Sequence, residues 1–210
     1  MTKKVLVLKG DSYKAVGEMF TAHGYDALYD IGSLSQADLV VFTGGSDASP
    51  YIYGEEPDGA RGCDPVRDEY EVDTYHACAG LVPMVGICRG GQLLNVLNGG
   101  RMIQHLGETI SGDVMMECYQ MVEDSSDYDR YRPMRVDHHQ GMLARDDGAE
   151  VLAWLPATKG YSPDYAIFYP ETKSLCFQPH PEWGHKGTED YFFELLDKHV
   201  FPEGSEKESD

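Results

Sequence analysis

The 210-residue sequence predicts an α/β fold with a mainly parallel central sheet. In the first half of the chain, short apolar runs alternate with stretches of helical spacing, which is typical of parallel strands joined by crossover helices. In the second half, short strand-like runs follow one another with turn residues between them. We therefore expect a sheet that is parallel at first, with antiparallel strands added later.

Short apolar runs and helical spacing define the elements of the first half. The predicted strands cover residues 4–8, 26–31, 39–42 and 84–87. The predicted helices cover residues 12–23, 68–79 and 90–97. Gly24 ends the first helix and Gly99-Gly100 the third. Asp68 and Glu71 give the middle helix an acidic start, which suits the positive end of a helix dipole.

The second half predicts further strands and one last helix. The strand-like runs cover residues 115–122, 134–136, 151–155, 165–169 and 174–177. From near Thr188, apolar residues recur at helical spacing around Phe192 and Leu195, which predicts an amphipathic helix docked on the core. Residues 203–210 are polar and are expected to fray, so we expect one domain over 1–202.

Composition and charge argue against several classes of protein. The formal net charge is −19, from 17 basic and 36 acidic residues, which disfavours nucleic acids and anionic membranes as partners and is most simply explained by solubility. No apolar run reaches membrane-spanning length, and the first residues do not resemble a signal peptide, so we expect a cytoplasmic location. Five cysteines without CxxC spacing predict reduced thiols rather than a disulfide framework or zinc ribbon.

Cys88 is the candidate nucleophile. It stands between a predicted strand and a predicted helix, with Gly86 two residues before it and Gly90 two residues after it. This G-x-C-x-G pattern has the form of a nucleophile elbow, where glycines permit a strained turn and the following helix favours a thiolate and an oxyanion. Taken alone, the pattern also fits a buried core cysteine beside an incidental turn.

His180 and Glu182 are the candidate base and orienting carboxylate. A thiol needs a partner to ionise at neutral pH. His180 follows an apolar strand, and a proline on each side of His180 keeps the backbone extended. Glu182, two residues on, can fix the tautomer of the imidazole, although the pair also fits a polar surface turn. Gly44-Gly45 follows another strand; it lacks the known phosphate-loop patterns and suits a backbone donor for an oxyanion.

The remaining chemistry-bearing residues have plainer explanations. We expect the other four cysteines to be packing residues. His138 and His139 are expected to line a pocket; they also suit a metal pair, but no third ligand stands at a recognised spacing. The acidic run 123–129 is most simply a solvated loop, with selection of a cationic substrate as the alternative.

Together these segments resemble the class I glutamine amidotransferases, and most closely the peptidase C26 branch that includes the gamma-glutamyl-gamma-aminobutyrate hydrolases. The motifs are GGSDASPYIYGEEP (44–57), RDxxE (67–71), GICRGGQLLNVLNGGRMIQH (86–105), HHQ (138–140) and HPE (180–182). They extend over most of the chain. The chain departs from the branch in two places. Gln178-Pro179 precedes the histidine, where the branch more often has an aromatic residue, and the segment before HHQ is shorter than is usual in the branch.

The resemblance implies a flavodoxin-like three-layer fold and a role for each matching residue. Cys88, His180 and Glu182 would form the catalytic triad. The backbone N–H groups of Gly45 and Arg89 would bind the oxyanion. The expected substrate-binding residues are Gly44, Gln92, His138 and His139, with Arg67 and Glu71 supporting the pocket. No metal or organic cofactor is required.

These residues predict a hydrolase that cleaves the γ-glutamyl amide bond of a small compound through a thioester. Two other functions remain open: a glutaminase subunit that passes ammonia to a partner synthetase, and a non-catalytic binding protein. A homodimer is also compatible with the sequence. Partner dependence would separate the first two functions, and the intact Cys, His and Glu argue against the third.

Overall fold

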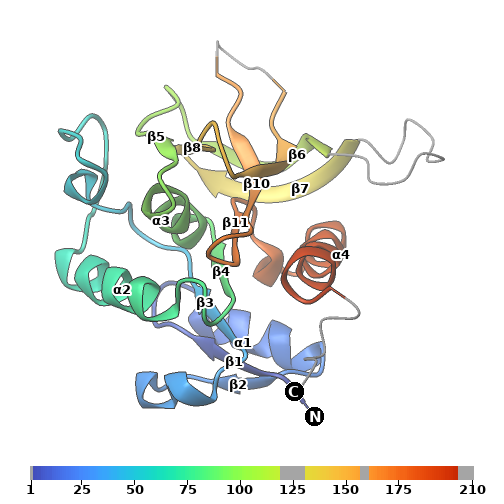
Figure 1. Cartoon of the computed structure of the whole chain (residues 1–210). Helices are drawn as coiled ribbons and strands as arrows, with labels where there is room; N and C mark the ends of the chain where they lie inside the picture. The colour runs from blue at the N-terminus through green and yellow to red at the C-terminus, as the bar shows by residue number, and fades with distance from the viewer. Residues whose placement is uncertain (1, 119–130, 157–160, 203–210) are drawn as a thin grey trace.

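The computed structural model describes residues 2–118, 131–156 and 161–202, which form three layers with a mixed sheet in the middle (Figure 1). The described strands form one sheet in the order β2-β1-β3-β4-β11-β10-β9-β6-β7, and β8 pairs with β10 and with β5. Neighbours from β2 through β11 are parallel, and the other pairs are antiparallel. The predicted fold class, parallel first and antiparallel later, is confirmed.

The element bounds follow the sequence patterns closely. The parallel strands are β1 (Lys4–Val7), β2 (Asp26–Leu28), β3 (Leu39–Phe42), β4 (Met84–Ile87) and β11 (Ser174–Phe177). The antiparallel strands are β5 (Arg101–Ile103), β6 (Ile110–Cys118), β7 (Tyr131–His138), β8 (Gly141–Leu143), β9 (Glu150–Trp154) and β10 (Asp164–Tyr169). The α-helices are α1 (Tyr13–Ala22), α2 (Pro65–Cys78), α3 (Arg89–Leu97) and α4 (Lys186–Leu195), and α4 continues into a π turn, η5 (Leu196–Val200).

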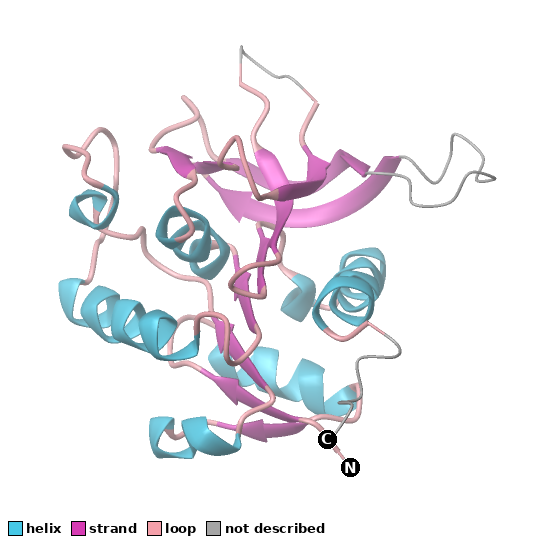
Figure 2. Cartoon of the chain, in the orientation of Figure 1, coloured by secondary structure: helices cyan, strands magenta, loops and turns pink. Residues whose placement is uncertain are grey.

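Helices cover both faces of the parallel strands (Figure 2). Because successive side chains of a strand point to opposite faces, Val5 packs on one side with α1 and α4, whereas Leu6 packs on the other with α2 and α3. Both faces of these strands are therefore buried, which explains why they appear in the sequence as continuous apolar runs.

Three sequence predictions change in detail. The strand expected over 26–31 ends at Leu28, because the Asp30 side chain accepts a hydrogen bond from the backbone N–H of Gly32 and starts the 3-10 helix η1 (Ile31–Gln36). Strands β5 and β8 were not predicted, since each has only three residues and no clear alternation. Of the run 115–122, residues up to 118 belong to β6, and the rest lies outside the described residues, as does the acidic run 123–129.

The acidic residues of α2 have a role that the sequence did not predict. Asp68 lies in the first turn, as predicted, but Asp68 and Glu71 are fully buried and form ion pairs with Arg89 on α3. The cap of α2 is Asp64 instead, whose carboxylate accepts from the N–H groups of Val66 and Arg67. In the part of the chain that the structure describes, no helix has the length and apolar character needed to cross a membrane.

Candidate active site

Cys88 lies in the sharp turn between β4 and α3, at the edge where the parallel strands end. Its backbone has φ 51° and ψ −112°, and a positive φ is strained for a residue with a side chain. A side chain at Gly86 would overlap the backbone of Gly90, and one at Gly90 would overlap the carbonyl of Phe42. The turn therefore has the geometry of the predicted nucleophile elbow.

Backbone hydrogen bonds hold the elbow on both sides. The Cys88 N–H donates to the carbonyl of Phe177 on β11 at 2.7 Å, and the Cys88 carbonyl accepts from the N–H of Gln92 at 2.9 Å. Only 7% of Cys88 is exposed. The residue stands at the first turn of α3, where free N–H groups and the helix dipole favour a negative charge.

His180 and Glu182 lie in the segment that follows β11, and β11 is the strand next to β4. The Nδ1 atom of His180 lies 2.7 Å from Oε1 of Glu182, and only 1% of the Glu182 side chain is exposed. The imidazole also stacks on Trp183, with ring centroids 3.8 Å apart and an interplanar angle of 6°. Because Nδ1 is engaged by the carboxylate, Nε2 is the nitrogen left for the Cys88 thiol.

The electrostatics of this group favour a charged imidazole. Burial disfavours the protonated form of His180, but the hydrogen bond and charge of Cys88, followed by those of Glu182, outweigh it and raise the pKa of His180 to about 10. A charged imidazole beside a cysteine is the arrangement that activates a cysteine nucleophile. Burial raises the pKa of the Cys78 thiol to about 11 and that of Cys176 as well, so these two thiols stay neutral.

The loop after β3 brings Gly44 and Gly45 beside the cysteine. A side chain at Gly44 would lie 3.4 Å from Cε1 of His180 and 3.8 Å from Cβ of Cys88, so this backbone directly faces the pair. Gly45 has φ 138°, a conformation that favours glycine. The loop is held by the N–H of Asp11, which donates to the Gly44 carbonyl at 3.2 Å, and by Arg67, whose Nη2 donates to the Thr43 carbonyl at 2.8 Å.

The side chain of Arg89 points away from the thiol into the protein. It is 2% exposed and forms ion pairs with Asp68 and Glu71, and Glu71 also accepts from Nε of Arg67 at 2.8 Å. Asp68 additionally accepts from the backbone N–H of Ser49 at 3.1 Å. This buried cluster ties α2, α3 and the loop after β3 together, so only the backbone of Arg89 remains for the site.

Gln92 and Gln178 form a polar chain that ends at the thiol. Nε2 of Gln178 lies 3.5 Å from Sγ of Cys88, and Nε2 of Gln92 donates to Oε1 of Gln178 at 3.0 Å. Both side chains are buried, and Gln178 is fully so. The sequence pattern singled out Gln92; it noted Gln178 only as a departure from the family and did not predict this contact.

His138 and His139 are engaged by other residues and line neither cavity described here. His138 is buried, with Nδ1 2.6 Å from the Gln140 carbonyl and Nε2 2.7 Å from the Tyr165 hydroxyl. Burial lowers the pKa of His138 to about 4, so its ring is neutral. Nε2 of His139 lies 2.9 Å from Oδ2 of Asp47. Among the described residues, no three His, Cys, Asp or Glu side chains gather as a metal site.

A cavity of about 210 Å³ opens beside the thiol. It is bounded by the loops that follow β1 and β3, by the turn after β4, by Asp137 near the end of β7 and by the segment after β11. The residues that bring chemistry to it are Asp11, Gly44, Gly45, Cys88, His180 and Glu182. The predicted triad and both glycines of the loop therefore face one space, whereas the side chains of Gln92 and Arg89 do not.

Comparison with known proteins places the chain in a family. A family model for peptidase C26 matches residues 26–154, more than half of the chain. The chain belongs to the peptidase C26 family, in agreement with the sequence motifs. Among curated proteins, the glutamine amidotransferase-like protein YvdE of Lactococcus lactis is 50% identical over 80 residues, which is 37% of this chain and 34% of that protein. The match thus spans about a third of that relative.

Solved structures share the fold at low sequence identity. A glutamine amidotransferase of Thermotoga maritima matches with a TM-score of 0.62 and 17% identity, over 93% of this chain and 84% of that one. The structure of PurLQS from the same organism matches with a TM-score of 0.64 and 15% identity, over 94% of this chain and 100% of that one. At such identities the likeness concerns the fold alone.

Proposed function

We propose that this chain is a cysteine-dependent hydrolase of C–N amide bonds that cleaves the γ-glutamyl amide of a small compound. The main support is the arrangement of Cys88 on a strained elbow that faces the same cavity as His180, whose Nδ1 lies 2.7 Å from Glu182. Membership of the peptidase C26 family supports a cysteine-dependent amide hydrolase in general. The γ-glutamyl specificity is the finer part of the proposal.

In the proposed reaction, the Cys88 thiolate attacks the side-chain carbonyl carbon and forms an S–C bond. As the C–N bond breaks, the His180 imidazolium gives its Nε2 proton to the leaving nitrogen. A glutamyl thioester remains. Neutral His180 then takes a proton from water while the water oxygen bonds to the thioester carbon. The S–C bond breaks, glutamate leaves, and the Cys88 thiolate and the His180 imidazolium are restored. Glu182 keeps the imidazole oriented and stabilises its charge throughout.

We assign the oxyanion to the backbone N–H groups of Gly45, in the loop after β3, and of Arg89, the first residue of α3. Gly44 forms the wall against His180, where a side chain would contact the imidazole. Gln92 acts on the glutamyl group through Gln178, because its amide is hydrogen-bonded to Gln178 and lines no cavity described here. His138 and His139 are assigned to holding the segment whose Asp137 carbonyl lies 3.9 Å from the thiol.

The experiment is hydrolysis of γ-glutamyl-γ-aminobutyrate, γ-glutamylputrescine and glutamine by the purified chain, with Cys88→Ala beside it. Cys63→Ala is the matched control, since Cys63 is a free thiol that lines neither cavity described here. We expect glutamate release by the wild type and by Cys63→Ala, and none by Cys88→Ala. Equal activity of the Cys88→Ala variant would refute the proposal.

The same assay addresses a glutaminase subunit, which would share the triad. Such a protein would release ammonia from glutamine at a rate that depends on a synthetase partner. A chain that is slow with glutamine but fast with substituted γ-glutamyl amides acts on its own. Mass spectrometry of the quenched reaction should show the glutamyl thioester on Cys88 both for a stand-alone hydrolase and for a glutaminase subunit. A non-catalytic protein would show none.

A further inference from the structure

A second cavity, larger than the one at the thiol, lies beside it. Its volume is about 730 Å³, within the range of roughly 300–1,000 Å³ that is typical of small-molecule sites, whereas the 210 Å³ at Cys88 falls below that range. Asp11 lines both spaces, and both are bounded by the loops after β1 and β3. A substrate that fills the smaller space therefore has room for its leaving group in the larger one.

The position of the cavity agrees with a general rule for α/β sheets. It opens where β1, β2 and β3 end, and the chain order reverses there, since β1 lies between β2 and β3. Crevices at such reversals, outside the carboxyl ends of parallel strands, are the usual ligand sites of open α/β sheets. Here that crevice adjoins a nucleophile one strand further along.

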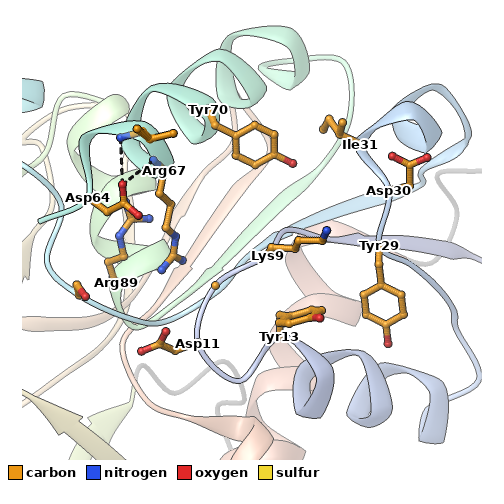
Figure 3. A pocket seen from close by; sticks show the side chains of 13 residues that line it. Lys9, Asp11, Tyr13, Tyr29, Asp30, Ile31, Asp64, Arg67, Tyr70 and Arg89 are labelled. Atoms are coloured by element: carbon orange, nitrogen blue, oxygen red, sulfur yellow. Dashed lines mark hydrogen bonds between the residues drawn. The ribbon is translucent and has the colours of Figure 1, made fainter.

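Aromatic rings from three elements frame this space (Figure 3). Tyr13 comes from α1, Tyr29 follows β2 and Tyr70 comes from α2; the Tyr13 and Tyr29 rings meet edge to face at 5.9 Å. Tyr29 is 39% exposed and the neighbouring Ile31 is 40% exposed, so the rim offers apolar surface that the fold itself leaves uncovered. Rings placed in this way suit a planar group of the ligand.

The cavity is lined by both basic and acidic side chains. Figure 3 shows the Lys9 side chain reaching in between the Tyr70 ring and the Tyr13–Tyr29 pair, with Asp11 toward the other end. Within the described part of the chain, neither an ion pair nor a hydrogen bond engages the Lys9 ammonium. In contrast, the Asp64 carboxylate caps α2 and that of Asp30 starts η1, so both are occupied by backbone donors.

We propose that this cavity is the subsite for the leaving group and that it takes an aromatic amino acid. The amine released by cleavage becomes an ammonium beside Asp11, the carboxylate pairs with Lys9, and the ring lies among the tyrosines. This inference rests on the proposed function and specifies its substrate class: a γ-glutamyl amide of an amino acid such as phenylalanine.

Four substrates separate the two contributions. γ-Glutamylphenylalanine carries both the carboxylate and the ring, γ-glutamyl-2-phenylethylamine lacks the carboxylate, γ-glutamylalanine lacks the ring, and γ-glutamylethylamide lacks both. For the wild type, we expect kcat/KM to fall about tenfold on loss of the carboxylate and about fivefold on loss of the ring. Equal kcat/KM for all four would overturn the subsite while leaving the γ-glutamyl hydrolase intact.

Two variants assign these effects to the cavity. Lys9→Gln should lower kcat/KM about tenfold for the two carboxylate-bearing substrates only, and Lys198→Gln, an exposed lysine that lines neither cavity described here, should change none. Tyr70→Leu should remove the preference for substrates that carry an aromatic ring. Tyr70→Phe keeps an aromatic side chain at this position and should retain that preference. If Lys9→Gln lowered kcat/KM by a similar factor for all four substrates, the pairing of Lys9 with the substrate carboxylate would be contradicted.

Binding of the leaving group tests the subsite without any chemistry. Calorimetric titration of the intact chain with phenylalanine should give a signal that Lys9→Gln weakens about tenfold and that 2-phenylethylamine does not reproduce. If no γ-glutamyl amide is hydrolysed but phenylalanine binds in this way, the subsite stands and the proposed reaction fails. Absence of Lys9-dependent binding overturns the subsite, whatever the activity.

Discussion

Replacement of Glu182 by Gln gives the sharpest test of the catalytic group. Glu182 Oε1 accepts from His180 Nδ1 at 2.7 Å, and the buried Oε2 has no hydrogen-bond partner among the described residues. The amide nitrogen of Gln can therefore occupy the Oε2 position while its oxygen keeps the contact with the imidazole. The substitution removes a charge and leaves the shape of the site almost unchanged.

The size of the effect follows from that charge. A hydrogen bond to a charged, buried partner contributes about 1.5–3 kcal/mol, and about 1.4 kcal/mol corresponds to one pKa unit. Because the Glu182 carboxylate stabilises the protonated imidazole, its loss must lower the pKa of His180, from about 10 toward roughly 8–9. The imidazolium is then lost at lower pH, and the loss of about 1.5–3 kcal/mol of charge stabilisation should lower kcat about 10- to 100-fold.

Two measurements follow this change. The alkaline limb of the pH profile of kcat should move to lower pH in Glu182→Gln, and NMR titration of the His180 ring should show the same shift without any substrate. Glu194→Gln is the matched control, since Glu194 is half-exposed and pairs with Arg132 on the surface. An unchanged His180 titration in Glu182→Gln would refute the assignment of Glu182 as the orienting carboxylate.

Further substitutions test the support of the site. Arg89→Met leaves two buried carboxylates without their partner and should lower the free energy of unfolding by about 3–5 kcal/mol in urea denaturation, whereas Arg132→Met, in an exposed pair, should change it by less than about 1 kcal/mol. Gln178→Leu removes a donor to the thiol and should lower kcat about tenfold in a γ-glutamyl hydrolysis assay, with unfolding by urea as the check on stability. Gly90→Ala forces a side chain against the Phe42 carbonyl and should lower the unfolding free energy by about 3 kcal/mol or prevent folding. Gly107 has open space around it, so Gly107→Ala should lower the unfolding free energy by about 1 kcal/mol. Equal unfolding midpoints for the two glycine variants would contradict the packing argument.

Much of the fold could be predicted because the signals are local. The runs at 39–42 and 84–87 are buried on both faces and coincide with β3 and β4. The strands that escaped prediction, β5 and β8, have three residues each, and their stability comes from pairing with each other and with β10. Such partners are distant in sequence, so no local pattern indicates them.

The same distinction applies to the site. The elbow at Cys88 and the pair of His180 and Glu182 are encoded in short segments, and the sequence placed them correctly relative to their strands. The contact of Gln178 with the thiol depends on the parallel pairing of β11 with β4, which joins residues about 90 positions apart. The burial of Asp68 depends likewise on α3, since a carboxylate in the first turn of a helix is ordinarily explained by the dipole alone.

The buried charges around Arg89 account for the strain at its neighbour. A positive φ at a residue with a side chain costs about 1–3 kcal/mol and persists only where the surroundings enforce it. On one side of Cys88, its N–H is held by the Phe177 carbonyl at 2.7 Å. On the other side, the guanidinium of Arg89 is fixed between two fully buried carboxylates on α2, which prevents the first residue of α3 from turning back toward an unstrained conformation. A buried ion pair is a weak source of stability, since its desolvation opposes the attraction. Its position one residue after Cys88 indicates that it contributes chiefly to the direction in which the thiol points, and stability and activity should therefore fall together when Arg89 is replaced.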